Sequence, residues 1–231
     1  MNKEFLSEKA QLRLQKIKEL NLPEYTKLEE FLNAFSHGVG AALSIVAIVL
    51  LIINSPFDAK SIICVTIYSV SLFVLYIIST LYHAIFPGKA KKVFRVLDHC
   101  SIFVLIAGTY TPICLLLLDS VIGWILFFVV WIAAIVGIVF NSIDIKKFSK
   151  FSMICYIAMG WVVVFAFKPL IESITSMQLL LLVLGGVAYT IGAVLYVLGK
   201  KKKYMHSIWH IFVLLGSILH FFMIFSCVKN L

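Results

Sequence analysis

The sequence predicts an all-α integral membrane protein, a seven-transmembrane helix bundle with a cytoplasmic N-terminus and an extracellular C-terminus. Three observations lead to this fold class. The first is composition: of 231 residues, 62% are hydrophobic and 13% are charged, and the mean hydropathy is +1.05, whereas a soluble domain carries about 25% charged residues. The second is the length of the apolar runs, and the third is the distribution of Lys and Arg between them.

Seven apolar runs are long enough to cross a membrane, since ~30 Å of hydrocarbon requires about 20 helical residues. None shows the alternation of apolar and polar residues that is typical of a membrane-spanning β-strand, so we expect helices, which satisfy their own backbone hydrogen bonds. The expected spans cover residues 33–53, 62–82, 99–118, 121–140, 152–171, 179–199 and 208–228. Turn-forming or charged residues separate each run from the next.

The first 30 residues are expected to form a cytoplasmic amphipathic segment, and residues 31–231 the transmembrane domain. The segment contains no apolar core of the kind that defines a secretory signal. A helix over residues 3–20 would place several apolar side chains on one face and would end before Pro23. These side chains are Leu6, Ala10, Leu14 and Ile17. We expect this helix to lie along the inner leaflet; the alternative is a solvated tail.

Most Lys and Arg residues fall on one side of the predicted bundle. The N-terminal segment holds six, the second connection four, the fourth three, and the sixth four, at 200–203. The other side holds Lys60, Lys168 and Lys229. Because cytoplasmic loops are enriched in Lys and Arg, this distribution places the N-terminus inside and the C-terminus outside. The net charge of +9 is therefore a topology signal, and we expect no nucleic-acid partner.

Small residues occur within the spans at the spacing that lets helices pack closely. Ala133 and Gly137 are four residues apart, as are Ala188 and Gly192. Pro112 lies inside the third run, where we expect a kink. The five cysteines lie in or at the edges of apolar runs without CxxC spacing, so we interpret them as buried thiols.

Metal-capable side chains recur at one depth, near the cytoplasmic ends of three predicted helices. Ser79 and His83 lie at the end of the second span, and Asp98 lies at the start of the third. His206 and His210 open the seventh. Residues four apart share one helix face, and ionisable groups at membrane depth usually mark a functional site.

Zinc is the metal that these groups suit best. Catalytic zinc takes three protein ligands, and His83, His206 and His210 can supply three imidazoles, whereas magnesium and calcium favour oxygen ligands. Imidazole also suits copper, iron and nickel, and a lone histidine is more often structural. Asp98 is expected to act as an acid near the ion or to orient a ligand, with Ser79 hydrogen-bonding beside it.

Four segments resemble the bacterial hemolysin III family, which is related to the progestin and adipoQ receptors, including the adiponectin receptors. The segments are "EEFLNAFSHGVGA" (29–41), "STLYHAIFPGK" (79–89), "LDHCSIFVLIAGTYTPI" (97–113) and "HSIWHIFVLLGSILHF" (206–221). The resemblance implies seven helices with the N-terminus inside. It also implies a zinc ion held by three histidines, with an aspartate and a serine nearby. The matching positions are His83, His206, His210, Asp98 and Ser79.

Five further polar residues need a role. Glu30, Asn33 and His37 match the first motif of this family, and we expect them to support the ligands or to pack between helices, with direct ligation as the alternative. His99 points about 100° away from Asp98 around a helix. His220 lies roughly 15 Å deeper than His210 by helical rise. We expect both of these histidines to be hydrogen-bonded outside the metal site.

The first functional hypothesis is zinc-dependent hydrolysis of a membrane lipid amide or ester, because relatives in this family include ceramidase-like enzymes. The substrate would be a membrane lipid or fatty acyl chain that enters the bundle sideways. One alternative is a non-enzymatic regulator of membrane homeostasis with structural zinc. Another, suggested by the family name, is a cytolytic hemolysin, although spans that are apolar all round offer no lining for a pore.

Two other partner classes are not expected. A retinal Schiff base requires a lysine inside the seventh span, and Lys229 lies at its outer end. A heterotrimeric G protein is not expected because the topology is inverted. The sequence therefore predicts a multi-pass protein of the plasma membrane, and it predicts no oligomeric state.

Overall fold

The computed structural model describes residues 8–199 and 202–231, which contain helices and no strands. Seven spans within these residues are long and apolar enough to cross a membrane, which confirms the predicted fold class. The spans are α2 (Lys27–Asn54), α3 (Ala59–Ala84), α4 with the π-helix η2 (Lys89–Pro112, Ile113–Leu118), α5 (Val121–Asp144), α6 with η3 and α7 (Ser149–Trp161, Val162–Ala166, Phe167–Ser173), α8 (Ser176–Leu198) and α9 (Met205–Val228).

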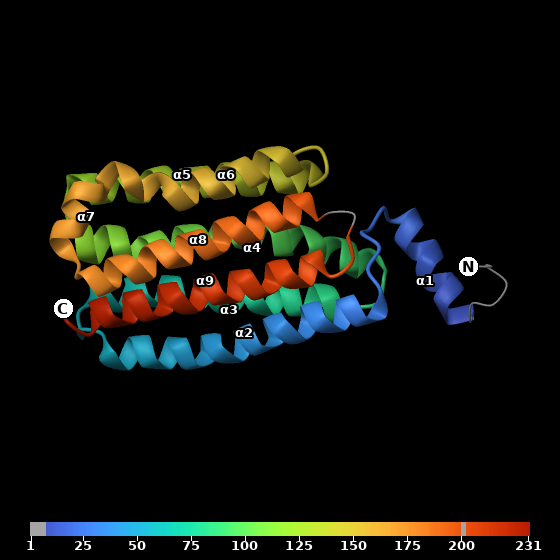
Figure 1. Cartoon of the computed structure of the whole chain (residues 1–231), viewed down its shortest axis with the longest axis horizontal. Helices are drawn as coiled ribbons and strands as arrows, with labels where there is room; N and C mark the ends of the chain where they lie inside the picture. Colours follow the sequence, from blue (N-terminus) through green and yellow to red (C-terminus); the bar gives the residue numbers. More distant parts are fainter. Residues whose placement is uncertain (1–7, 200–201) are drawn as a thin grey trace.

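The spans lie side by side and alternate in direction (Figure 1). α2 packs against α3 and α9, α9 packs against α8, and α3 packs against α4. α4 is the central helix: 72% of its apolar window is buried, whereas no other span buries more than 50%. The bundle is therefore organised around α4, with the remaining helices presenting apolar side chains to lipid.

The helices extend beyond the apolar runs because polar residues cap their ends. The Thr26 hydroxyl accepts a hydrogen bond from the Glu29 N–H, and the Glu29 carboxylate accepts one from the Thr26 N–H. This capping box satisfies backbone donors at the start of α2. The largest difference concerns α4, which begins at Lys89 and not at residue 99 as predicted. The apolar run marks only the part of the helix that lies in hydrocarbon, whereas α4 also includes the basic residues before it.

The interruption expected at Pro112 takes the form of a change in helix type. α4 ends at this residue and continues as the π-helix η2. Proline has no backbone N–H to donate to the preceding turn, and a widened turn is one way in which a helix accommodates that loss.

The small residues admit large side chains from neighbouring helices. Gly137 on α5 lies against the buried Phe103 ring of α4. Gly192 on α8 lies against Trp209 and Phe212 of α9. All five cysteines are free, four of them buried, as expected. Close helix packing in this bundle thus depends on glycines, which have no side chain, at a few positions.

The N-terminal helix α1 spans Glu8–Glu19 and lies beyond one end of the bundle (Figure 1). It corresponds to the predicted amphipathic helix, although Leu6 falls outside the described residues, as do residues 200–201. Ile17 on its apolar face is buried. The Arg13 guanidinium donates a hydrogen bond to the Tyr25 carbonyl at 2.9 Å, which holds α1 against the segment leading into α2. A location along the inner leaflet remains a prediction.

One prediction concerns the contact between α4 and α5. A Cβ atom on Gly137 would lie 2.2 Å from the Phe103 ring, which is fully buried. We expect Gly137→Ala to lower the thermal unfolding temperature in detergent, with a loss of about 1–3 kcal/mol, because overpacking forces the ring to move. Gly160→Ala is the matched control, since a Cβ there meets nothing within 4 Å. Equal effects of the two substitutions would contradict this packing.

A second prediction concerns orientation. The alternation of the spans brings the connections predicted to be cytoplasmic to the end of the bundle where α1 lies (Figure 1). Alkaline phosphatase needs disulfides and is active only outside the cytoplasm. We expect it to be active when fused after Leu231 and inactive when fused after Phe148. The reverse pattern of activities would show that the charge distribution was misread.

Candidate metal centre

Three histidines from two helices converge at the α1 end of the bundle. The His206 Nε2 lies 3.2 Å from the His83 Nε2 and 3.1 Å from the His210 Nε2. All three ligand atoms lie within 4.8 Å of one another, as required for binding one ion. Tetrahedral zinc with Zn–N bonds of about 2.05 Å separates its nitrogen ligands by about 3.3 Å. The donor set and its spacing therefore fit zinc.

Local structure fixes where the two histidines of α9 lie. His206 and His210 occupy one face in the first turns of this helix, which begins directly after Tyr204. Tyr204 has a left-handed backbone conformation, with φ of 62°, and its N–H donates a hydrogen bond of 2.8 Å to Glu29. The Glu29 side chain, in the first turn of α2, thereby stabilises the strained backbone conformation of Tyr204 at the start of α9.

Two residues predicted to support the ligands contact the outer nitrogens of the imidazoles. The His83 Nδ1 lies 2.7 Å from a Glu30 carboxylate oxygen, and the His210 Nδ1 lies 3.2 Å from the backbone carbonyl oxygen of Asn33. Both oxygens accept hydrogen bonds, so each Nδ1 carries the proton and each Nε2 presents a lone pair toward the centre. The Ser207 hydroxyl donates to the Asn33 side chain at 2.6 Å. Such supporting contacts orient metal ligands in known sites.

His37, the third residue of this group, contacts a ligand differently. Its ring stacks on His210 with the centroids 3.6 Å apart, and Tyr76 meets it edge-on at 5.0 Å. The side chain is buried, and neither nitrogen has a hydrogen-bond partner among the described residues. His37 therefore contacts the site through ring stacking on a ligand.

The Glu30 carboxylate is the centre of a charged network that the sequence did not indicate. The Lys91 ammonium lies 2.8 Å from it, and the Arg13 guanidinium lies 3.8 Å from it. Lys91 is 2% exposed and also donates to the Ile85 carbonyl at 3.1 Å. This network compensates a carboxylate that would otherwise be costly at this depth. The sequence indicates Lys91 only as one of the four charges of the second connection, and its position in a basic run gives no signal of burial.

Tyr25 covers the centre on the side facing α1. Its ring stacks on His206 at 5.0 Å and lies 5.7 Å from the His83 ring. Burial raises the pKa of the Tyr25 hydroxyl well above its usual value, so this cover is uncharged at neutral pH. A tyrosine in a connecting segment carries no sequence signal for this role.

The predicted catalytic pair lies deeper in the bundle. Ser79 is fully buried one turn before His83 on α3, and the Asp98 carboxyl group of α4 lies beside it. The Ser79 hydroxyl makes no hydrogen bond of standard geometry with the described residues. The structure thus brings Asp98 and Ser79 together on the side of the histidines that faces the membrane centre.

The two remaining histidines, His99 and His220, are not among the three whose nitrogens could hold one ion. The His99 carbonyl accepts a hydrogen bond from Tyr156 at 2.7 Å. The His220 Nε2 lies 3.1 Å from the Leu182 carbonyl oxygen, and its ring fits against Gly185. The expected placement of His220 deeper in the bundle is confirmed.

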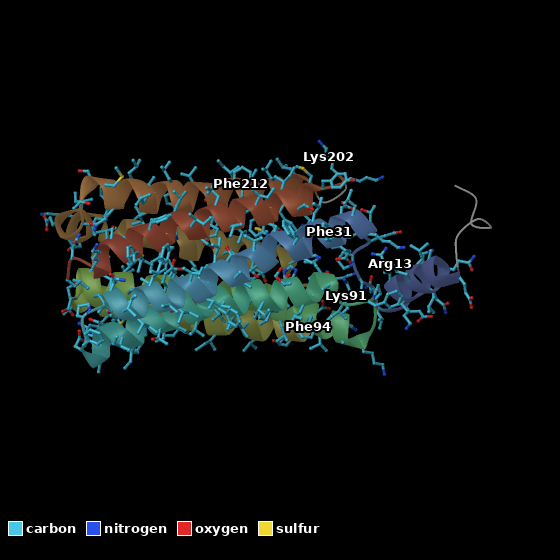
Figure 2. All side chains as sticks on the ribbon, turned by 90° about the horizontal axis from the view of Figure 1, so that it is seen from below. Arg13, Phe31, Lys91, Phe94, Lys202 and Phe212 are labelled. Atoms are coloured by element: carbon cyan, nitrogen blue, oxygen red, sulfur yellow. The ribbon has the colours of Figure 1, made fainter. Side chains whose placement is uncertain are left out.

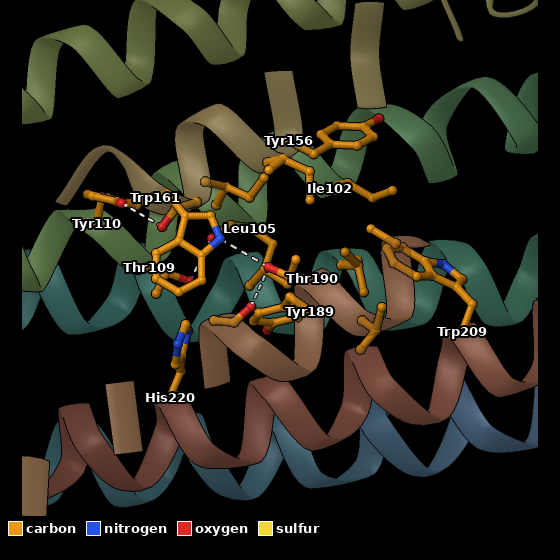
Figure 3. Close-up of a pocket in the computed structure, with 17 residues that line it drawn as sticks. Ile102, Leu105, Thr109, Tyr110, Tyr156, Trp161, Tyr189, Thr190, Trp209 and His220 are labelled. Atoms are coloured by element: carbon orange, nitrogen blue, oxygen red, sulfur yellow. Dashed lines mark hydrogen bonds between the residues drawn. The ribbon is translucent and has the colours of Figure 1, made fainter. Parts of the chain in front are cut away.

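A predominantly apolar cavity lies beyond the catalytic pair (Figure 3). Leu75 and Ile102 belong to its lining, each one helical turn from Ser79 or Asp98. Most polar groups in its wall bond within the protein: the Trp161 N–H, for example, donates to the Thr190 hydroxyl at 3.0 Å. The cavity therefore presents a mostly hydrocarbon surface next to the candidate site.

Comparisons with known proteins agree on one family. The chain matches the family described as "Haemolysin-III related" over residues 25–221. It is 45% identical to "Hemolysin-3" of Bacillus cereus over 196 residues, which is 84% of this chain and 89% of that protein. It is 44% identical to "Hemolysin-3 homolog" of Bacillus subtilis (strain 168) over 208 residues, 89% and 97% of the two chains. A weaker similarity, 27% over 216 residues, or 87% and 85% of the two chains, links it to the human "Monocyte to macrophage differentiation factor".

The geometry generates a prediction about metal content. We expect zinc to co-purify with the protein and His83→Gln to abolish that zinc content, since a ligand is lost, whereas Glu30→Gln should weaken zinc binding by about 10- to 100-fold. His220→Gln is the control, because this imidazole lies outside the group. Elemental analysis of the protein purified in detergent measures the effect. Full zinc occupancy in His83→Gln would contradict the assignment.

Proposed function

This chain belongs to the haemolysin III family, as its four motifs indicated, and is a multi-pass protein of the bacterial plasma membrane; from this premise we propose that it is a zinc-dependent hydrolase of a membrane lipid amide or ester. The observation that carries the proposal is the convergence of three imidazole Nε2 atoms, with Ser79 one helical turn deeper on α3 and the Asp98 carboxyl group of α4 beside Ser79. A bound zinc ion would polarise a carbonyl group and make water nucleophilic at neutral pH.

The residues of the chain would divide the remaining work. Glu30 and Asn33 hold His83 and His210 in the tautomer that ligation requires. Asp98 would accept a proton from the attacking water and return it to the leaving amine or alcohol. Ser79, beside Asp98, would orient that carboxyl group.

The apolar cavity supports a lipid as the substrate. It begins one helical turn beyond Ser79 and Asp98 and continues among α4, α6, α8 and α9 (Figure 3). An acyl chain in this cavity would place its carbonyl end toward the histidines. Tyr25 would close the opposite side, which limits the access of bulk water.

A structural role for zinc is the second candidate. The two ligand-bearing helices α3 and α9 are both tied to α2 through Glu30 and Asn33, so an ion would clamp three helices together. This role needs the histidines but gives Asp98 no function. A cytolytic role is suggested only by the names of the two Bacillus relatives.

Hydrolysis assays separate these candidates. Purified protein is incubated with ceramides and with ester-linked phospholipids, with and without chelator. We expect a zinc-dependent product and expect Asp98→Asn to lower kcat by at least about 100-fold while zinc content stays unchanged. Asp144→Asn, at an exposed carboxylate of the same end of the bundle, is the control.

Two results would decide against the hydrolase. The first is the absence of a zinc-dependent product from every lipid tested. The second is full activity in Asp98→Asn. If chelation lowers the unfolding temperature while no lipid is cleaved, zinc has the structural role.

A further inference from the structure

A groove separate from the apolar cavity opens at the α1 end of the bundle. Its walls are α1, the first turns of α2, the last turn of α3 with the following segment, and Lys91 of α4, and His83 also borders it. Figure 2 shows Arg13, Phe31 and Lys91 at this end of the molecule. Because these are the ends of membrane-spanning helices, the groove lies at the depth of lipid headgroups.

The lining of the groove is positively charged. Arg13, Lys27 and Lys91 contribute cations, and Glu30 contributes the one carboxylate among its lining residues. The short ion pair of Lys91 already compensates Glu30. The charges of Arg13 and Lys27 are therefore left without a full counter-charge in the groove.

Both of these side chains retain hydrogen-bond donors. The hydrogen bond and the ion pair of Arg13 with described residues both use Nη2, and no contact of Nη1 or Nε with a described residue competes with a ligand. Lys27 is exposed and has no hydrogen bond or ion pair with any described residue. The N-terminus of α4 follows the groove-lining segment, and its N-cap Gly88 offers no side-chain hydrogen bond. Helix N-termini of this kind favour anions.

The outer wall of the groove is apolar and faces lipid. Phe31 is 61% exposed and stacks on Phe35, one turn further into the membrane, at 5.9 Å. Phe86, which also lines the groove, is 41% exposed, and the Lys16 ammonium lies over its ring at 5.6 Å. A ligand that fits would thus have an anionic head and an apolar body lying along Phe31 and Phe35.

We propose that this groove binds the phosphate group of an anionic phospholipid from the adjacent leaflet, through Arg13 and Lys27, with its acyl chains against the aromatic face of α2. The cytoplasmic leaflet, which the charge distribution places at this end, is rich in anionic lipids. The site does not depend on the proposed hydrolysis. It adjoins the metal centre through Glu30, which contacts both Arg13 and His83.

Ligand-dependent thermal unfolding tests this site in protein purified in a neutral detergent. Dioctanoyl phosphatidylglycerol should raise the unfolding temperature saturably, because a ligand that binds the native state stabilises it. Dioctanoyl phosphatidylcholine and inorganic phosphate should produce a much smaller rise. An equal rise in unfolding temperature with inorganic phosphate would show that the groove binds a free anion. An equal rise with phosphatidylcholine would show that binding does not depend on the charge of the headgroup. Either result overturns the proposal.

Matched variants locate the effect. Arg13→Gln with Lys27→Gln should raise the half-saturating phosphatidylglycerol concentration by about tenfold or more, as the loss of charge-assisted hydrogen bonds requires. Lys92→Gln with Lys150→Gln removes the same charge from exposed positions outside the groove and should leave that concentration unchanged.

Lys27→Gln alone guards against misfolding, since this exposed side chain holds no partner in place, and a rise of about threefold is expected. Identical half-saturation in the groove variants and in the Lys92/Lys150 pair would overturn the proposal. The assay reads binding and not turnover, so its outcome is independent of the lipid hydrolysis experiment.

Discussion

The contact between Glu30 and His83 is the interaction on which the arrangement of this end of the bundle depends. Hydrocarbon offers no water to a carboxylate or an imidazole, so each must find a partner inside the protein. Glu30 is the partner for side chains of two helices, since it accepts a hydrogen bond from His83 of α3 and forms an ion pair with Lys91 of α4. Glu29, its neighbour, holds the start of α9. Two adjacent carboxylates in the first turn of α2 thereby fix three other helices.

Two contrasting environments lie on either side of the candidate metal centre. The cavity among α4, α6, α8 and α9 is mostly apolar, whereas the groove under α1 carries cations. The three histidines, with Asp98 and Ser79, lie between them. A molecule with a hydrocarbon part and a polar part matches this succession better than a soluble metabolite does. This succession of environments supports the proposal that the site takes an amphiphile.

Much of this fold could be predicted from the sequence because hydrocarbon imposes a simple rule on length and polarity. The seven spans follow from apolar runs, and the depth of His83, His206 and His210 follows from the alternation of direction. The start of α4 at Lys89 did not follow, because a helix that leaves the hydrocarbon loses its apolar pattern without losing its hydrogen bonds. Lys91 and Tyr25 were missed for a related reason: their roles come from tertiary contacts at the bundle end, where neither periodicity nor spacing distinguishes a buried residue from a solvated one.

The order in which the ligands occur along the chain has a consequence for biogenesis. His83 and His206 are separated by 123 positions, and the helix that carries His206 and His210 is the seventh span of the described residues along the chain. A nascent chain that stops after α8 has one of the three imidazoles, together with the ion pair of Glu30 and Lys91. If the three histidines bind an ion as proposed, that binding requires α9, and a chain that lacks α9 keeps His83 without its two partner imidazoles.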